Sequence, residues 1–357
     1  MLSSSGDSAQ VDLLADALLS IVVPVFNEEE VVNELHNRLS GVLTSIALPW
    51  EVVYVNDGSS DRTIELLTEL RRLDNRVAIV DLSRNFGKEI AMTAGLDASK
   101  GDAVVVIDAD LQDPPELISE FVRHWREGFD VVYARRTQRE GEGWFKRSTA
   151  HLFYRVIGLL SEVKIPADTG DYRLLSRRAV DALGRVREKH RYMKGLFAWI
   201  GYRQKEIPYT RRPRFAGKTK WSYWRLWNFA LEGITSFTSA PLKIAMYVGF
   251  VIALGALVYA AHVIYDTLAH GNPVAGYPSL LVVVLMLGGI QLIAIGLIGE
   301  YLARVFDESK GRPLYFVKSF LPSADGRADV WLANGSVASR GDSQASITSR
   351  TGASGPG

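Results

Sequence analysis

Residues 103–116 read A-V-V-V-I-D-A-D-L-Q-D-P-P-E, and this stretch determines the fold class. Its first five residues are apolar, which is typical of a strand buried on both faces of a parallel sheet. Side chains two residues apart in an extended chain point the same way. If the strand persists to Asp110, Asp108 and Asp110 therefore project together from its C-terminal end, where open α/β sheets bind their ligands.

Two carboxylates at the end of a strand predict a cation site. Their hard oxygen atoms suit Mg²⁺ or Mn²⁺, especially when a substrate phosphate completes the coordination shell. The alternative is a pair of solvated turn residues, which an isolated D-x-D motif favours. Asp113 is assigned differently, because two prolines and Glu116 follow it, and this pattern predicts an N-cap and capping box for the next helix.

The composition of the chain excludes several classes of site. The 357 residues carry a formal net charge of +1, which gives no argument for nucleic acid as a partner. The absence of cysteine excludes disulfides, a thiol nucleophile and a cysteine-ligated metal. Residues 1–10 are polar and Ser-rich, so no signal peptide is predicted and the globular part is expected to remain in the cytosol.

Apolar runs alternate with helical spacing along the first part of the chain. Strands are predicted at residues 18–26, 50–55, 77–82, 103–107 and 131–134, and helices at 28–43, 61–73, 87–98 and 114–127. This alternation implies right-handed βαβ crossovers and a mostly parallel sheet. Four polar residues that follow strands are expected to converge on one edge of the sheet: Asn27, Asp57, Asp108 and Asp110. Asp57 lies in N-D-G-S, where it can also serve simply as a turn former.

The pattern becomes more polar after residue 134. Residues 135–147 are predicted to form a loop with five basic residues, in which Arg135 and Arg139 act either as part of a mobile lid over a ligand or as solvated side chains. A helix is predicted at 145–160.

Residues 166–178 are predicted to form a loop that places Asp168 and Asp171 beside Arg173. An ion pair between Asp171 and Arg173, two residues apart on such a loop, would be weak. Strand-like alternation follows at 201–209.

A basic and aromatic segment precedes the apolar end of the chain. Residues 211–225 contain six Lys or Arg residues interleaved with aromatic side chains. They are candidates for phosphate binding, and simple attraction to anionic lipid is the alternative. Residues 221–240 resemble an interfacial helix that lies on the cytosolic leaflet of a membrane.

Two long apolar stretches follow, at residues 244–264 and 280–299. Each has about 20 residues, the length that a helix needs to cross a hydrocarbon core of about 30 Å. The connector lacks Lys and Arg whereas both flanks carry them, so the positive-inside rule places both flanks in the cytosol. A pair of buried core helices is the alternative, but such helices are seldom apolar all round.

These patterns predict the following organisation: a flexible N-terminus (1–17), an α/β catalytic domain (18–220), an interfacial region (221–240), two transmembrane helices (241–303), a cytosolic juxtamembrane segment (304–322) and a disordered tail (323–357). A P-loop NTPase and a dinucleotide-binding domain are disfavoured, because their glycine motifs are missing. A cytosolic α/β domain joined to a membrane hairpin suggests a water-soluble phosphate-bearing substrate and a lipid substrate.

Five ordered motifs resemble family 2 glycosyltransferases with the GT-A fold: V-P-V-F-N-E-E-E (23–30), V-N-D-G-S-S-D (55–61), L-S-R-N-F-G-K (82–88), D-A-D-L-Q-D-P-P-E (108–116) and T-G-D-Y-R-L (169–174). Within that family, R-F-A-G-K-T-K (214–220) and G-E-Y-L-A-R-V-F-D-E-S-K-G-R-P-L-Y (299–315) resemble bacterial polyprenyl-phosphate glycosyltransferases. The nearest group is that of the bactoprenol glucosyltransferases, which serve O-antigen modification.

The resemblance implies a role for each matching residue. The implied donor-binding residues are Pro24, Phe26, Asn27, Glu28, Asp57, Lys88, Asp108, Ala109 and Asp110, with Asp57 on the uracil of a UDP-sugar and with Asp108 and Asp110 on the divalent cation. Phosphate or lipid contacts are implied for Arg135, Arg139, Arg214, Thr219 and Lys220. The implied catalytic residues are Asp171, Asp110 and Arg214, and Asp171 is either a base or a positioning residue.

The chemistry of the implied acceptor bears on the role of Asp171. A phosphomonoester has a second pKa near 6, so a polyprenyl phosphate is largely dianionic at neutral pH and needs little deprotonation before it attacks. A strong general base is therefore dispensable, and Asp171 can instead orient Arg173, the sugar or the metal shell. The larger requirements are to position two polyanions and to neutralise the departing UDP.

We therefore expect an inverting, metal-dependent glycosyltransferase that moves glucose from UDP-glucose onto polyprenyl phosphate, with Mg²⁺ or Mn²⁺ as cofactor. The alternatives are the same reaction with a UDP-aminoarabinose-type sugar, a UDP-N-acetylhexosamine or GDP-mannose, and a non-catalytic membrane scaffold. The expected location is the inner membrane, multi-pass, with the catalytic domain and both termini in the cytoplasm. No nucleic acid partner is expected, and the resemblance suggests a homo-oligomer, a tetramer.

Overall fold

The computed structural model describes residues 16–136, 169–189, 191–210 and 276–324, together with scattered helical residues between 249 and 269. The helices predicted at 145–160 and 221–240 lie outside the described residues, as does most of the apolar stretch predicted at 244–264. Four predicted site residues also lie outside them: Arg139, Arg214, Thr219 and Lys220.

The described residues form one eight-stranded sheet with the order β7-β5-β6-β4-β1-β2-β3-β8. The strands are β1 (Leu19–Val25), β2 (Trp50–Asn56), β3 (Val77–Leu82), β4 (Ala103–Val106), β5 (Val131–Arg136), β6 (Thr169–Ser176), β7 (Gln204–Tyr209) and β8 (Val317–Leu321). β1 pairs in parallel with β2 and β4, and β2 pairs in parallel with β3. β6 runs antiparallel to both β4 and β5. The α/β sheet expected from the sequence is confirmed, with a parallel centre and antiparallel additions.

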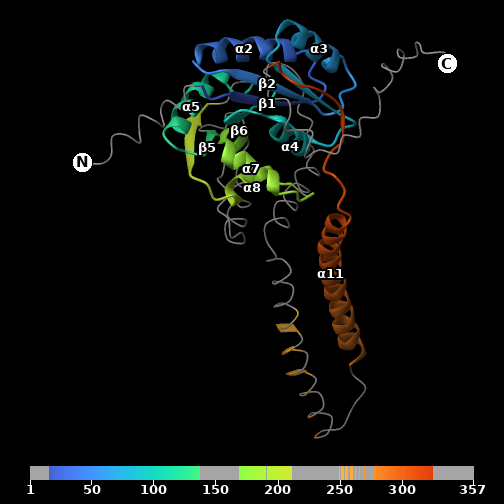
Figure 1. Cartoon of the computed structure of the whole chain (residues 1–357). Coiled ribbons are helices and arrows are strands. Elements are labelled where there is room, and N and C mark those ends of the chain that lie inside the picture. Colours follow the sequence, from blue (N-terminus) through green and yellow to red (C-terminus); the bar gives the residue numbers. More distant parts are fainter. Residues whose placement is uncertain are drawn as a thin grey trace, which may run out of the picture.

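Helices cover both faces of this sheet (Figure 1). One face packs against α2 (Val32–Ser45), α3 (Thr63–Leu73) and α5 (Ile118–Arg126), and the other against α4 (Lys88–Ala98), α7 (Arg177–Arg185) and α8 (Met193–Trp199). Ile21 faces the first layer and Val22 the second, and neither side chain is exposed to solvent. The central strands are therefore apolar on both faces, which is why they are continuous hydrophobic runs in the sequence.

A long helix, α11 (Tyr277–Ser309), extends away from the sheet (Figure 1). Its segment Leu287–Ser309 is long and apolar enough to cross a membrane, with a mean hydropathy of 1.4 and none of it buried. The helix predicted at 280–299 is thus confirmed as a helix, and it continues further at both ends.

The chain returns to the α/β domain after α11. β8 pairs antiparallel with β3 at the edge of the sheet. The hydroxyl of Tyr315 donates to Asp97 of α4 at 2.7 Å, and that of Ser323 donates to the buried carboxylate of Glu51 at 2.6 Å. The segment predicted only as juxtamembrane, 304–322, therefore contributes an edge strand to the sheet. Five residues of weak alternation directly after a long helix give little strand signal.

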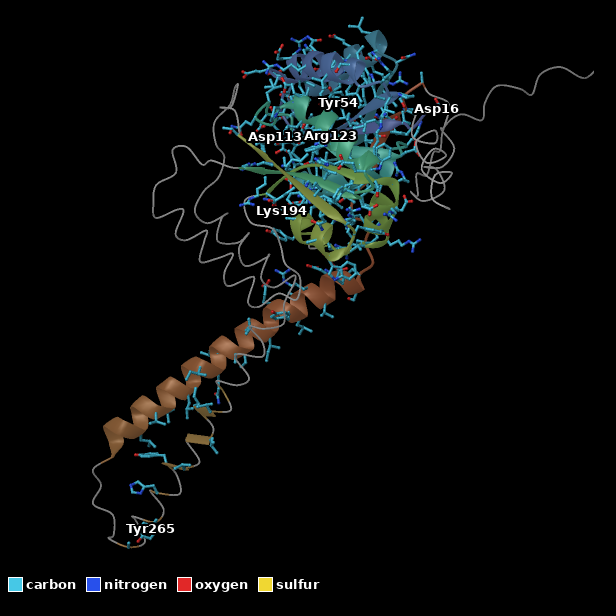
Figure 2. The ribbon with its side chains drawn as sticks, turned by 90° about the vertical axis from the view of Figure 1, so that its left-hand side faces the viewer. Asp16, Tyr54, Asp113, Arg123, Lys194 and Tyr265 are labelled. Carbon is cyan, nitrogen blue, oxygen red and sulfur yellow. The ribbon has the colours of Figure 1, made fainter. Side chains whose placement is uncertain are left out.

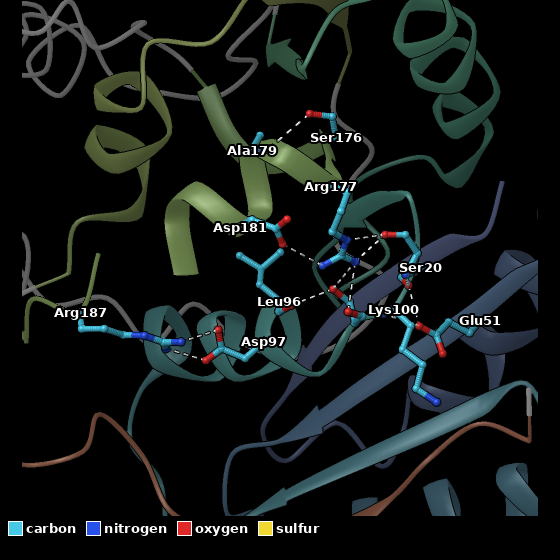
Figure 3. A network of polar contacts seen from close by, with 12 residues as sticks. Ser20, Glu51, Leu96, Asp97, Lys100, Ser176, Arg177, Ala179, Asp181 and Arg187 are labelled. Carbon is cyan, nitrogen blue, oxygen red and sulfur yellow. Dashed lines mark hydrogen bonds and ion pairs between the residues drawn. The ribbon is translucent and has the colours of Figure 1, made fainter. Parts of the chain in front are cut away.

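Arg177, the first residue of α7, anchors the carboxyl end of β6 (Figure 3). This end lies away from the edge of the sheet that carries Asn27, Asp57 and Asp108. Its guanidinium donates to the carbonyl oxygen of Gly101 at 2.8 Å and to that of Ser99 at 3.1 Å. Both acceptors belong to the connection between α4 and β4. These hydrogen bonds therefore help to fix the register of β6 on β4. That register in turn determines which side chains the two strands carry at the opposite end.

Gly95 lies where α4 approaches the sheet most closely. A Cβ atom on Gly95 would overlap the side chain of Val22 and would lie 2.9 Å from that of Val55. We predict that Gly95→Ala lowers the free energy of unfolding by about 1–3 kcal/mol, because the added methyl group overpacks the interface. Gly41→Ala is the matched control, because Gly41 is also helical and has nothing within 4 Å of its Cβ position. It should raise stability by about 0.5–1 kcal/mol. Urea denaturation of both variants measures the difference, and equal effects would contradict the packing argument.

Candidate active site

The strand order brings several acidic residues to one edge of the sheet. Asp57 follows β2 and Asp108 follows β4, both at carboxyl ends. β6 runs the other way, so its amino end reaches the same edge and carries Asp171. The β4–β6 register ends with Val106 opposite Arg173, and Asp108 and Asp171 each lie two residues beyond that pair.

The strand predicted at 103–107 is confirmed, but it does not persist to Asp110. β4 ends at Val106, and the chain then turns, with Leu111 at a φ of +56°. The carboxylate of Asp110 accepts a hydrogen bond from the backbone N–H of Gln112 at 3.2 Å, which is the local bond that an aspartate makes in a turn. Asp108 and Asp110 are therefore placed by a turn and not by strand alternation.

Lys88 joins Asp108 to Asp171. It is the first residue of α4, and its Nζ lies 2.6 Å from Oδ1 of Asp108 and 2.6 Å from Oδ2 of Asp171. The ammonium also donates to Oδ2 of Asp108 at 2.8 Å. Burial alone would lower the pKa of Lys88, but Asp108 and Asp171 raise it above its ordinary value. These charge-assisted contacts favour the ionised forms of Lys88 and Asp171.

Asp171 lies in β6 and not in the loop predicted at 166–178. Its side chain is buried and pairs with Lys88, whereas the alternative considered from the sequence was an ion pair with Arg173. The guanidinium of Arg173 stacks on the ring of Phe197 at 3.8 Å and donates to the carbonyl oxygen of Gly170. Burial alone would raise the pKa of the Asp171 carboxyl, but the ammonium groups of Lys88 and Lys194 lower it below its ordinary value.

Oδ1 of Asp171 is buried without a hydrogen-bond partner among the described residues. A buried carboxylate oxygen in this state is costly unless a ligand supplies a donor or a cation. This atom is thus a sign, independent of sequence motifs, that the edge accepts a ligand.

Glu89 is a residue of this cluster that the sequence did not reveal. Burial and the neighbouring Asp171 carboxylate raise the pKa of Glu89 to about 8. Its Oε2 atom is buried without a hydrogen-bond partner in the described part of the chain. Lys194, labelled in Figure 2, comes from α8 on the same side of the sheet and lowers the pKa of both carboxyl groups.

Asp57 holds together two loops at this edge. Its side chain is buried, and its two oxygens accept hydrogen bonds from the backbone N–H groups of Phe86 and Gly87 at 2.7 and 3.0 Å. Gly58 has a φ of +66°, and a Cβ there would lie 2.5 Å from the carbonyl carbon of Arg84. The turn-former explanation of Asp57 is therefore incomplete, because its carboxylate fixes the loop that leads into Lys88.

Asn27 and Glu28 tie the end of β1 to the loop after β2. Asn27 has a φ of +54°, its Oδ1 accepts from the N–H of Ser60 at 2.8 Å, and its own N–H donates to the hydroxyl of Ser59. The N–H of Glu28 donates to the hydroxyl of Thr63 at 2.9 Å. Pro24 lies within β1 opposite Val55 of β2.

Phe26 and Ala109 differ in exposure. The side chain of Phe26 is 38% exposed at the end of β1, where an apolar ring is available to a ligand, whereas Ala109 is buried.

Arg136 is a second residue that sequence reasoning missed. The predicted ligand-binding Arg135 points to the surface and pairs with Glu206 at 3.0 Å. Arg136 instead donates to the hydroxyl of Tyr209 at 3.4 Å. Burial alone would lower the pKa of Arg136, but Tyr209, Asp113 and Asp108 raise it. The alternation of a strand that continues to residue 136 would have separated the two arginines.

The predicted N-cap role of Asp113 is also wrong. The short helix that precedes α5 has Pro114 as its N-cap, without a side-chain cap. The buried carboxylate of Asp113 accepts from the hydroxyl of Tyr209 in β7 at 2.6 Å (Asp113 is labelled in Figure 2). Asp113 therefore bonds to a residue that is distant in the sequence instead of capping the helix. This bond ties the turn after β4 to the far edge of the sheet.

The donor set at this edge fits a divalent cation that a substrate completes. No group of three His, Cys, Asp or Glu side chains able to hold a metal occurs among the described residues. Asp108 and Asp110 supply carboxylate oxygens, and Mg²⁺ is commonly held by one or two carboxylates together with substrate phosphates. The residues present are therefore compatible with Mg²⁺ or Mn²⁺ bound together with a diphosphate.

The raised pKa of Glu89 predicts a pH dependence of stability. In the unfolded chain Glu89 loses its proton near its ordinary pKa, whereas in the folded chain it retains it up to about pH 8. Its contribution to stability is therefore complete at low pH and is lost as the pH rises to about 8. Glu89→Gln cannot ionise, so it should gain stability relative to the wild type as the pH rises from about 5 to 8. Thermal unfolding across this range measures the difference, and a constant difference would contradict the raised pKa.

Comparison with known proteins places this geometry in a family. Residues 20–184 match the model of glycosyl transferase family 2, and residues 240–305 match that of the GtrB C-terminal hairpin. An uncharacterized glycosyltransferase of Synechocystis sp. is 54% identical over 299 residues, which cover 84% of this chain and 94% of the relative.

Relatives with a stated activity are also similar over most of their length. The bactoprenol glucosyl transferase of Shigella phage SfV is 45% identical over 301 residues, which cover 84% of this chain and 98% of the relative. A prophage bactoprenol glucosyl transferase homolog of Escherichia coli is 45% identical with the same coverage. The expected GT-A type of α/β fold is confirmed, and the chain belongs to glycosyl transferase family 2, in the group that carries a GtrB C-terminal hairpin.

Proposed function

We propose that this glycosyltransferase moves glucose from UDP-glucose onto a polyprenyl phosphate, with inversion at the anomeric carbon. The observation that carries the proposal is the cluster of Asp108, Lys88 and Asp171 at the carboxyl edge of the sheet, in a chain 45% identical to bactoprenol glucosyl transferases. The buried oxygen of Asp171 without a partner supports a ligand at this edge.

The donor is proposed to lie across the ends of β1, β2 and β4. The exposed ring of Phe26 offers an apolar surface to the base, and Asp57 defines the neighbouring loop. The backbone of Pro24, Asn27, Glu28 and Ala109 borders the same edge. Asp108 and Asp110 would hold Mg²⁺ or Mn²⁺, which would neutralise charge on the departing diphosphate. Lys88 lies 2.6 Å from Asp108 and can reach the same phosphate oxygens.

Asp171 is proposed to position the reacting groups instead of removing a proton. Its pKa lies below the ordinary value, so it is ionised and a poor proton acceptor at neutral pH. The acceptor phosphate is already largely dianionic there. The Asp171 carboxylate holds the Lys88 ammonium, whose charge attracts phosphate.

The lipid substrate is proposed to reach this edge from a membrane that α11 enters. The exposed apolar segment Leu287–Ser309 and the match to the GtrB C-terminal hairpin support this placement. The basic segment at 211–225, with Arg214, Thr219 and Lys220, would contact phosphate groups, and Arg135 and Arg139 would border the donor. A plasma-membrane location with a cytoplasmic catalytic domain and assembly into a homo-oligomer remain part of the proposal.

Radiolabelled UDP-glucose, undecaprenyl phosphate and Mg²⁺ are predicted to yield a chloroform-soluble labelled product. Asp108→Asn and Asp110→Asn should lower its rate by about 10²-fold or more, because charge on the departing diphosphate is then less well neutralised. Asp181→Asn is the matched control, since Asp181 is exposed and, in the described part of the chain, pairs with Arg177 of its own helix. A panel containing UDP-N-acetylglucosamine, a UDP-aminoarabinose-type sugar and GDP-mannose tests the donor. No lipid-linked label with any donor would refute the proposal.

The role of Asp171 predicts a particular pH profile. If the acceptor phosphate must be dianionic, the rate should fall on the acid side with a midpoint of about 6. Asp171→Asn should lower kcat and keep that midpoint, because the titrating group belongs to the lipid. Loss of the acid limb in Asp171→Asn would instead identify Asp171 as the general base.

A further inference from the structure

The Lys88 ammonium lies against the carboxylate that a divalent cation would need. Its Nζ donates to Oδ2 of Asp108 at 2.8 Å and lies 2.6 Å from Oδ1, which has no hydrogen-bond partner among the described residues, and it is 2.6 Å from Asp171. Metal ligation and hydrogen bonding at this range use the same lone pairs of the carboxylate. The ammonium and the metal ion are also both positive, so they repel one another when they share a carboxylate.

The charge of Asp108 is already partly neutralised without a metal. One ammonium stands between two carboxylates, 2.6 Å from an oxygen of each. A divalent cation that approaches Asp108 therefore meets a carboxylate whose charge is partly neutralised. It must first displace a cation that forms short, charge-assisted contacts.

Lys88 has the freedom to be displaced. Its side chain is 45% exposed, and it begins α4 directly after Gly87, which has a φ of +98°. A lysine ammonium on its four-carbon stem changes direction readily. A diphosphate that binds beside Asp108 brings negative oxygens to the same place, and the ammonium can form its contacts with these oxygens instead.

We propose that Lys88 is a resident counter-cation that keeps a divalent ion off Asp108 until a nucleoside diphosphate offers the ammonium a new partner. Metal then binds together with the nucleotide and not before it. When the ammonium moves to a phosphate oxygen, Asp108 becomes free to bind the metal. Lys88 then attracts the donor electrostatically. The inference rests on the proposed function only in that a nucleoside diphosphate and a divalent ion bind at this edge.

Mn²⁺ binding to the full-length protein in detergent tests the proposal without turnover. Electron paramagnetic resonance measures free Mn²⁺ in titrations with and without UDP, and a protein-free titration corrects for Mn²⁺ held by UDP itself. The wild type should bind Mn²⁺ weakly alone and about tenfold more tightly with UDP. Lys88→Met should bind Mn²⁺ without UDP about tenfold more tightly than the wild type, since Asp108 is then free.

Lys205→Met is the matched control, because it removes the same charge from an exposed position in β7 away from this edge. It should bind Mn²⁺ as the wild type does. Circular dichroism checks that each variant is folded. If Lys88→Met does not fold because two carboxylates lose their partner, the double variant Lys88→Met, Asp171→Asn keeps the charge of the pair and still frees Asp108, and it should show the same gain.

Two results would overturn the proposal: equal Mn²⁺ affinity without UDP in the wild type and in the folded Lys88 variant, or weaker binding in the variant. Either would leave the proposed glycosyl transfer unaffected, because that depends on the appearance of a lipid-linked product. If Lys88→Met gains Mn²⁺ affinity but no lipid-linked product forms, the role of Lys88 is supported and the proposed glycosyl transfer is refuted.

Discussion

The candidate site depends on one strand that runs against its neighbours. β6 is inserted between β4 and β5 and is antiparallel to both, so its amino end meets the carboxyl end of β4. This arrangement brings Asp171 to the same edge as Asp108, and Lys88 of α4 contacts both carboxylates. Arg177 holds the far end of the same strand. A slip of one residue would turn Asp171 to the other face of the sheet and dismantle the site.

The parallel centre of the fold could be predicted because its signals are local. Apolar runs gave β1 to β5 within a few residues of their ends, and spacing gave α2 to α5. The partners of individual side chains could not be predicted in the same way. Asp113 and Asp171 looked like a helix cap and a loop residue because the sequence displays only near neighbours, whereas Tyr209 and Lys88 are 96 and 83 residues away.

Motifs located the site but did not reveal its electrostatics. Asp57, Asp108 and Asp171 are recognisable from their surroundings in the sequence, yet nothing there shows that Lys88 neutralises two of them. Glu89 and Arg136 lacked any motif, and their importance comes from burial and from charges on other elements. Perturbed pKa values and buried atoms without partners mark functional edges more directly than residue type does.

The edge strand β8 has a consequence for the order in which the molecule can be made. A ribosome completes β1 to β7 well before the apolar helix α11, and β8 emerges only after it. Until then the edge of β3 is uncovered, Glu51 lacks the hydroxyl of Ser323, and Asp97 lacks that of Tyr315. The α/β domain thus reaches its final form after the helix has been synthesised. A complete sheet therefore indicates that the apolar segment has already been synthesised.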